Sequence, residues 1–181
     1  YQTVFARASG SAAAPTAGLH FTPDLLAALV ARGIQRAEVT LHVGLDTFRP
    51  ITAERIADHP MHTEWCECPA ATAVAVRETR ARRGRVAAIG TTAVRTLETA
   101  ARAAAEGEAI AAWSGPTDLF IRPGHTFRAV DVMLTNFHMP RTTLMVLVST
   151  FAGRDLIARV YAEAIRERYR FLSYGDAMLL A

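Results

Sequence analysis

Residues 85–107 read RVAAIGTTAVRTLETAARAAAEG, and this stretch contains a complete strand–turn–helix unit. A short apolar run ends at Gly90, two threonines follow, and an alanine-rich segment with helical spacing comes next. Proteins of the α/β class use such a junction to present backbone N–H groups to an anion or a polar ligand. The stretch therefore predicts an α/β fold, with ligand-binding groups at Gly90, Thr91 and Thr92.

Helical and strand patterns alternate on both sides of this unit. The first helix is expected to begin where Thr22 supplies a hydroxyl cap and Pro23 occupies the first helical position. The helical patterns cover residues 22–33, 53–57, 70–84, 93–107, 141–153 and 155–169, and the strand patterns cover residues 37–44, 62–68, 85–90, 119–124 and 127–137. This alternation predicts a single α/β domain over residues 1–181, with a largely parallel or mixed sheet flanked by helices.

The composition is typical of a globular protein, because 51% of the 181 residues are hydrophobic and 20% are charged. All 20 basic residues are arginines, so any contact to a phosphate must come from guanidinium groups, which bind in a forked, two-bond geometry. The formal net charge of +3 and the pI near 9.3 permit a nucleic-acid partner without requiring one.

Cysteine usage and hydropathy indicate where the protein works. Cys66 and Cys68 are one residue apart, which is too close for an ordinary disulfide and fits a reducing compartment. The longest apolar run, residues 144–153, falls short of the ~20 residues that a membrane span needs. We also expect no signal peptide. We therefore expect a cytoplasmic protein with no membrane partner, and since nothing predicts an oligomer, we expect a monomer.

Several polar residues stand where predicted strands or turns end, which is where open α/β sheets bind their ligands. They are His20, His42, Thr91, Thr92, Asn136 and His138. Imidazole is the side chain best matched to proton transfer near neutral pH. Each residue also has a purely structural interpretation: a loop histidine often bonds a backbone carbonyl, and a threonine after glycine often caps a helix.

Three charged residues have an equally plain alternative. Arg95 and Glu98 lie one turn apart on the predicted helix and could form an exposed ion pair, and Arg49 before Pro50 could be a solvated arginine.

One short segment contains several potential metal ligands. His59, His62, Cys66 and Cys68 offer four potential zinc ligands within ten residues. Structural zinc sites usually bring two ligand pairs together from separate turns, whereas this segment is predicted to extend into a strand that would spread the ligands apart. We expect no metal here.

Taken together, the motifs resemble one family, the S-adenosylmethionine:tRNA ribosyltransferase-isomerases of queuosine biosynthesis. The resemblance runs in family order along the whole chain and is far more specific than any single glycine motif. It rests on AAPTAGLHFT (13–22), TLHVGLDTFRP (40–50), MHTE (61–64), GTTAVRTLE (90–98), TDLFI (117–121) with PG (123–124), LTNFHMPRTTLMVLVSTFAG (134–153) and YRFLSYGDAM (169–178).

The resemblance implies a reaction. The ribosyl group of S-adenosylmethionine would be transferred to the aminomethyl group of a 7-deazaguanine base at the wobble position of tRNA. It would rearrange there to give epoxyqueuosine, while adenine and methionine leave. S-adenosylmethionine is then a consumed substrate, no separate cofactor is implied, and the partner is tRNA carrying the 7-aminomethyl-7-deazaguanine base.

The resemblance also implies roles for residues. The reaction needs a base for the acidic ribose C5′–H, an acid or hydrogen-bond donor for the leaving adenine, and a group that takes a proton from the attacking amine. We expect His20 and His42 to be the acid/base pair and His138 the third catalytic histidine. The candidate substrate-binding residues are Pro15, Thr16, Ala17, Gly18, Gly44, Arg49, Glu64, Gly90, Thr91, Thr92, Arg95, Glu98, Asp118, Asn136 and Asp176.

Among these, the Pro15–Gly18 turn and the two threonines would hold the nucleoside or the methionine by hydrogen bonds. Arg49 and Arg95 are candidates for the methionine carboxylate or a tRNA phosphate, and Glu64 and Glu98 for ribose hydroxyls or the methionine ammonium. Asn136 would face a base edge. The two aspartates would support these contacts from behind.

The chain departs from the family pattern at some positions. Asp46 stands where the family usually has glycine, Met139 and Arg141 replace leucine and lysine, and Trp65 is atypical. The resemblance further implies an amino-terminal part with a small inserted β-barrel domain, which this chain does not contain. Two alternatives therefore stay open: a noncatalytic nucleoside- or tRNA-binding homologue, and a related transferase with a different acceptor.

Overall fold

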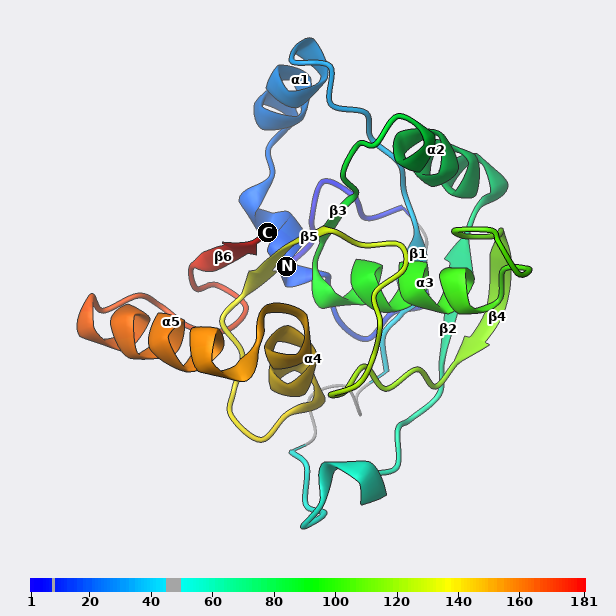
Figure 1. The fold of residues 1–181 in the computed structure, drawn as a ribbon. Helices are drawn as coiled ribbons and strands as arrows, with labels where there is room; N and C mark the ends of the chain where they lie inside the picture. Colours follow the sequence, from blue (N-terminus) through cyan, green and yellow to red (C-terminus); the bar gives the residue numbers. More distant parts are fainter. Residues whose placement is uncertain (8, 45–49) are drawn as a thin grey trace.

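Helix α3 (Thr91–Arg102) occupies the centre of the molecule, between two small sheets (Figure 1). The computed structural model describes residues 1–7, 9–44 and 50–181. Strand β3 (Ala87–Ile89) leads into α3 through Gly90, whose φ of 90° lies in the left-handed region that favours glycine. The strand–turn–helix unit predicted from the sequence is therefore confirmed.

The strands form two three-stranded sheets. In the first, β1 (Thr40–His42) pairs with β2 (Glu64–Cys68), and β2 pairs with β4 (Trp113–Thr117), all antiparallel. In the second, β5 (Val132–Asn136) lies between β3, to which it is parallel, and β6 (Ala177–Leu180), to which it is antiparallel. The predicted α/β fold is confirmed. Only the second of the two sheets is mixed, and the first is antiparallel.

The longer predicted helices are also confirmed. They are α1 (Pro23–Ala31), α2 (Ala70–Ala81), α4 (Thr143–Ala152) and α5 (Arg154–Arg166), with a 3₁₀ turn η1 (Thr16–His20) before α1. The Thr22 hydroxyl accepts a hydrogen bond from the Leu25 N–H at 3.1 Å, so the predicted cap is present. The helix expected over residues 53–57 is only a 3₁₀ turn, η3 (Ile56–Asp58).

Two predictions at the strand level were wrong. Residues 119–124 form no strand: the strand lies earlier, at β4, and the apolar Leu119 and Ile121 are instead buried from a loop that turns at Gly124. Conversely, the tail contains strand β6, whose Met178 and Leu180 are buried while Leu179 is 65% exposed. Whether such apolar residues form a strand depends on the presence of a partner strand. A local sequence pattern does not show which segments pair.

Helix α1 projects away from the two sheets (Figure 1), and none of its residues is buried. Within residues 1–7, 9–44 and 50–181, no helix has the length and apolar character needed to cross a membrane.

The two faces of the second sheet allow a stability test. Met133 on β5 is completely buried, so we expect Met133→Ala to lower the free energy of unfolding by about 2–5 kcal/mol through lost contacts and a cavity. The matched control is Leu179→Ala on neighbouring β6, which we expect to stay within about 0.5 kcal/mol of the parent. Urea denaturation followed by circular dichroism measures both, and equal losses would contradict this assignment of the core.

Candidate functional site

Three of the predicted site residues meet where β5 ends. Asn136, which is buried, accepts a hydrogen bond at Oδ1 from the Thr16 hydroxyl at 3.2 Å. Its Nδ2 lies 3.2 Å from Nε2 of His20, at the end of η1. The carboxamide of Asn136 therefore bridges the two ends of the Thr16–His20 turn.

This bridge fixes the tautomer of neutral His20. Nδ2 of an asparagine can only donate, so Nε2 of His20 accepts, and the ring proton of the neutral imidazole lies on Nδ1. His20 itself is exposed. The residue thus offers an N–H donor to whatever binds beside it.

The same cluster includes the glycine turn before α3. The Gly90 N–H donates to the Leu134 carbonyl at 2.8 Å, which holds the turn against β5. A Cβ at Gly90 would lie 3.6 Å from Cβ of Ala17 in η1. The Pro15–Gly18 turn is closed by a 2.8 Å bond from the Gly18 N–H to the Pro15 carbonyl. The structure therefore brings η1, the start of α3 and Asn136 together.

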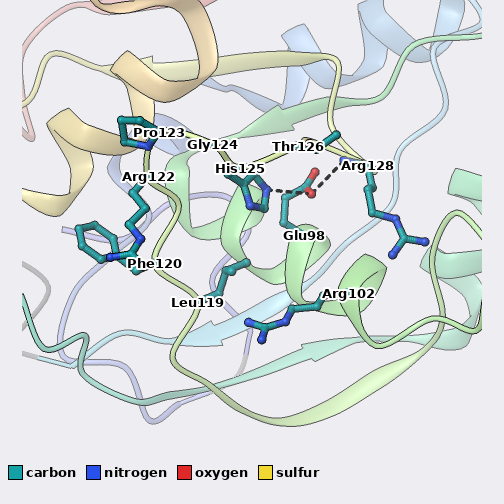
Figure 2. A pocket seen from close by; sticks show the side chains of 10 residues that line it. All are labelled: Glu98, Arg102, Leu119, Phe120, Arg122, Pro123, Gly124, His125, Thr126 and Arg128. Carbon is teal, nitrogen blue, oxygen red and sulfur yellow. Dashed lines mark hydrogen bonds and ion pairs between the residues drawn. The ribbon is translucent and has the colours of Figure 1, made fainter. Parts of the chain in front are cut away.

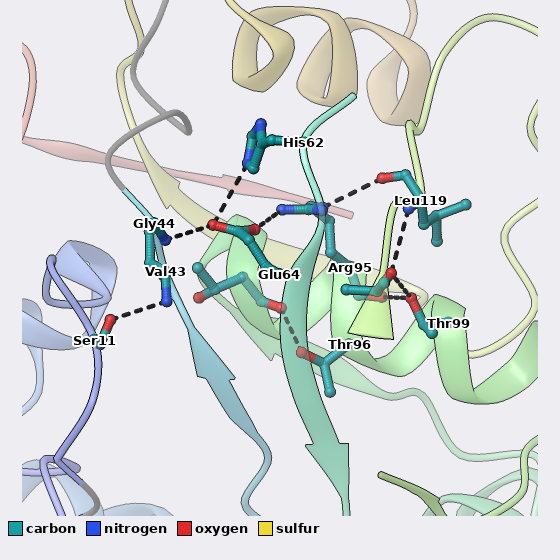
Figure 3. Close-up of polar contacts among 11 residues, drawn as sticks. Ser11, Val43, Gly44, His62, Glu64, Arg95, Thr96, Thr99 and Leu119 are labelled. Atoms are coloured by element: carbon teal, nitrogen blue, oxygen red, sulfur yellow. Dashed lines mark hydrogen bonds and ion pairs between the residues drawn. The ribbon is translucent and has the colours of Figure 1, made fainter. Parts of the chain in front are cut away.

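A second cluster centres on the buried carboxylate of Glu64 on β2 (Figure 3). Its Oε2 accepts a hydrogen bond from Nη1 of Arg95 on α3, and its Oε1 accepts one from the Gly44 N–H at 2.9 Å. Nε2 of His62 lies 3.5 Å from Oε1. A charge pair removed from water needs such a set of donors to offset its desolvation.

The Arg95 guanidinium is only partly satisfied by the described residues. Its Nε donates to the Leu119 carbonyl at 3.3 Å and its Nη1 to Glu64, whereas the buried Nη2 has no hydrogen-bond partner within the described part of the chain. Arg95 itself is 4% exposed. A buried guanidinium with a spare N–H edge is suited to binding a small anion such as a carboxylate.

The other two predicted histidines lie elsewhere. His42 pairs across the sheet with Trp65, and their rings lie 5.1 Å apart on the face of β2 opposite to the buried Glu64 and Cys66. A Cβ at Gly10 would lie 3.0 Å from the His42 ring, so the amino-terminal segment covers it closely. The structure does not bring His42 to the Glu64–Arg95 pair.

His138 bonds to Thr135, which points to the face of β5 opposite to Asn136. Its Nε2 lies 2.8 Å from the Thr135 hydroxyl, and its backbone N–H donates to the Tyr161 hydroxyl at 2.7 Å. Burial lowers the pKa of His138 to about 4, so the ring is neutral at pH 7. This environment gives the ring a packing role and makes it a weak base.

Both carboxylate oxygens of Glu98 are occupied by contacts within the protein (Figure 2). One carboxylate oxygen accepts the backbone N–H groups of Ala129 and Val130, at 3.0 and 3.1 Å. The other accepts that of Arg128 at 3.0 Å and lies 3.3 Å from Nε2 of His125. Its position on α3 makes it an anchor for the 125–130 loop.

The remaining predicted residues fall into three groups. Asp176 closes a loop, because its carboxylate accepts the Arg170 N–H at 2.7 Å while its carbonyl lies 3.5 Å from Nδ2 of Asn136. Asp118 is exposed immediately after β4. Arg49, and Asp46 among the departures from the family pattern, lie outside the described residues.

The sequence motifs did not place His62 among the candidate site residues, although the structure places it beside Glu64. A signal was present, because His62 and Glu64 are two positions apart at the start of a strand, and alternate residues of an extended chain share a face. The prediction instead grouped His62 with candidate zinc ligands.

The two cysteines of that zinc hypothesis are buried on one face of β2. Burial raises the pKa of Cys66, and it raises the pKa of Cys68 to about 11, so both are protonated thiols at neutral pH. Within the described ranges, no group of three or more potential ligands is arranged to hold a metal ion.

Comparison with known proteins identifies the family. The sequence profile described as queuosine biosynthesis protein matches residues 1–180. The chain belongs to this family. Three of its motif-bearing segments, residues 13–22, 90–98 and 134–153, meet at η1, the start of α3 and the end of β5.

Relatives within the queuosine biosynthesis family carry a specific name. The S-adenosylmethionine:tRNA ribosyltransferase-isomerases of Geobacter sulfurreducens and Mesorhizobium japonicum are 58% and 56% identical to the chain over 99% of its length. The crystal structure of S-adenosylmethionine tRNA ribosyltransferase from Thermotoga maritima matches 92% of the chain with a TM-score of 0.76 and 46% identity. The chain spans about half the length of these relatives.

The buried Glu64–Arg95 pair predicts that replacing one partner lowers the free energy of unfolding more than replacing both. Arg95→Met leaves the Glu64 carboxylate without its counter-charge, and we expect a loss of about 3–5 kcal/mol in the free energy of unfolding. Arg95→Met with Glu64→Leu removes both charges, so we expect it to be more stable than the single variant. Denaturant titration of both variants checks this, and a double variant less stable than Arg95→Met would contradict it.

His138 predicts a pH dependence of stability. Its pKa is about 4 in the folded protein and 6.5 in an ordinary environment, so between these pH values the unfolded chain binds a proton that the folded chain does not. Stability therefore falls as the pH drops from 6.5 to 4, by about 3 kcal/mol from this residue. We expect His138→Gln to show a shallower fall. Parallel pH profiles for the two proteins would show that another group is responsible.

Proposed function

We propose that the protein containing this chain is an S-adenosylmethionine:tRNA ribosyltransferase-isomerase. It would transfer and isomerise the ribosyl moiety of S-adenosylmethionine onto 7-aminomethyl-7-deazaguanine at the tRNA wobble position, with release of adenine and methionine. The observation that carries the proposal is the 53–58% identity, over at least 99% of the chain, to relatives named for this activity. We further propose that the reaction takes place in the cytoplasm.

We assign the leaving adenine to His20. Breaking its bond to ribose requires stabilisation of the departing ring by a proton or a hydrogen bond at a nitrogen. Asn136 holds Nε2 of His20 and leaves Nδ1–H as the outward donor, which supports this role. Thr16 orients the carboxamide of Asn136 and so sets the direction of the imidazole indirectly.

We assign the methionine carboxylate to Arg95. Its unpartnered Nη2 supplies the N–H, and the Glu64 carboxylate and the Leu119 carbonyl hold the rest of the guanidinium still. A pre-positioned guanidinium loses little rotational freedom on binding, so the contact favours affinity.

We assign the proton-accepting role for the ribose C5′–H to His62 in place of His42. A histidine beside a carboxylate is oriented by it and is stabilised when protonated. Nε2 of His62 lies 3.5 Å from Oε1 of Glu64, while the His42 ring lies 5.1 Å from the Trp65 ring on the opposite face of the sheet. The two assigned histidines thus come from the two clusters that α3 connects.

The activity is tested with the full-length protein, S-adenosylmethionine labelled in its ribose, and tRNA that bears the 7-aminomethyl-7-deazaguanine base. We expect release of adenine and transfer of label to the tRNA. His20→Ala should slow both by about 10²–10⁴-fold while donor binding, measured by calorimetry, is kept, because a donor to the leaving group acts mainly in the transition state.

The control is Arg166→Ala at the end of α5, where the exposed guanidinium pairs with Glu163 and Glu167, and we expect the parent rate. No turnover by the full-length protein would reject the enzymatic proposal. Normal turnover by His20→Ala would reject the role of His20 and leave the activity in place.

A further inference from the structure

A positively charged cleft lies beside the carboxyl-terminal half of α3 (Figure 2). Its volume is about 480 Å³, and it lies between α3 and the loop that follows β4. Three arginines line it, Arg102 from α3 and Arg122 and Arg128 from the loop, together with His125. None of these residues was singled out by the sequence motifs.

The carboxylate that lines the cleft does not neutralise the positive charge of its three arginines. Glu98 is the one carboxylate that lines it, and both of its oxygens are occupied by the backbone N–H groups of residues 128–130 and by the His125 ring. Among the described residues, none of the three arginines forms an ion pair with a carboxylate. The cleft therefore presents net positive charge to solvent.

The guanidinium groups keep most of their donors. Nη1 of Arg122 donates to the Ala57 carbonyl at 3.2 Å, and Nη2 of Arg128 donates to the Glu108 carbonyl at 2.7 Å. Each guanidinium carries five N–H donors, so these single bonds position the groups and leave several N–H groups for an anion. Phe120 and Pro123 add an apolar wall.

The floor of the cleft is fixed by Glu98. Its three bonds to consecutive backbone N–H groups hold residues 128–130 against α3, and a turn from the Arg122 carbonyl to the His125 N–H at 3.0 Å closes the loop. The arginines therefore project from a pre-formed surface, which lowers the entropic cost of binding.

We propose that this cleft binds phosphate groups of the tRNA backbone outside the reaction site, an inference that rests on the proposed function for its partner. Glu98 and Arg102 follow Arg95 on one face of α3, at i+3 and i+7. At 1.5 Å per residue, Arg102 lies about 10 Å along the axis from Arg95. The cleft is thus adjacent to the reaction site and separate from it.

The ligand class follows from the donors. Forked guanidinium groups match the planar pairs of oxygens on phosphates, and several of them around one open cleft suit successive groups of a polyanion. Backbone contacts of this kind position an RNA without reading its sequence.

The test is the salt dependence of tRNA binding by the full-length protein, measured by fluorescence anisotropy between 50 and 200 mM KCl. Each lost phosphate contact reduces the slope of log K against log salt by about 0.7–0.9. We expect Arg102→Gln, Arg122→Gln and Arg128→Gln each to show this reduction, and the triple variant to lose about 2–3 from the slope.

The matched control is Arg82→Gln, whose guanidinium bonds the Gln35 side chain at the end of α2 and should leave the slope unchanged. A triple variant with the parent slope would overturn the inference, and so would an equal fall in the control. Ribosyl transfer by the parent protein is assayed in parallel. Its absence would reject the proposed function, whereas transfer with an unchanged triple-variant slope would reject only the phosphate cleft.

Discussion

The arrangement of the molecule depends on one constraint: α3 is buried between two sheets and carries a positive and a negative charge in its buried part. Arg95 is balanced from β2 by Glu64, and Glu98 is balanced by backbone N–H groups of the 128–130 loop. Each charge would be costly if left unpaired away from water. The Arg95–Glu64 pair holds the antiparallel sheet against one part of α3. The hydrogen bonds of Glu98 hold the 128–130 loop against the next part.

These two sets of contacts give neighbouring turns of α3 different chemical surroundings. Around Arg95 the groups are buried and few, which suits recognition of a small charged group in a fixed place. Around Arg102 the guanidinium groups are exposed and more numerous, which suits a larger and less closely defined anion. The anchoring of Glu98 separates the two regions, since its carboxylate is no longer available to either.

The sequence predicted local structure well. It predicted less well which face of a sheet each side chain occupies. The unit around Gly90 and the cap at Thr22 are local features, and both occur as expected. His42 and His138 were grouped with His20 because all three follow strands or turns, yet register and alternation place them on other faces. The strand expected at residues 119–124 failed for a related reason, because its apolar residues are buried without any partner strand. Long-range pairing sets these outcomes, and a single sequence does not display it.

The chain contains no lysine, so its Lys/Arg-type positive charges are all guanidinium groups. A guanidinium keeps its charge over the pH range in which proteins stay folded, so arginine suits the attraction of a polyanion and not proton transfer. Proton transfer needs a side chain such as imidazole, which can both give and take a proton. In the proposed enzyme, attraction of the polyanion and proton transfer therefore fall to different kinds of side chain.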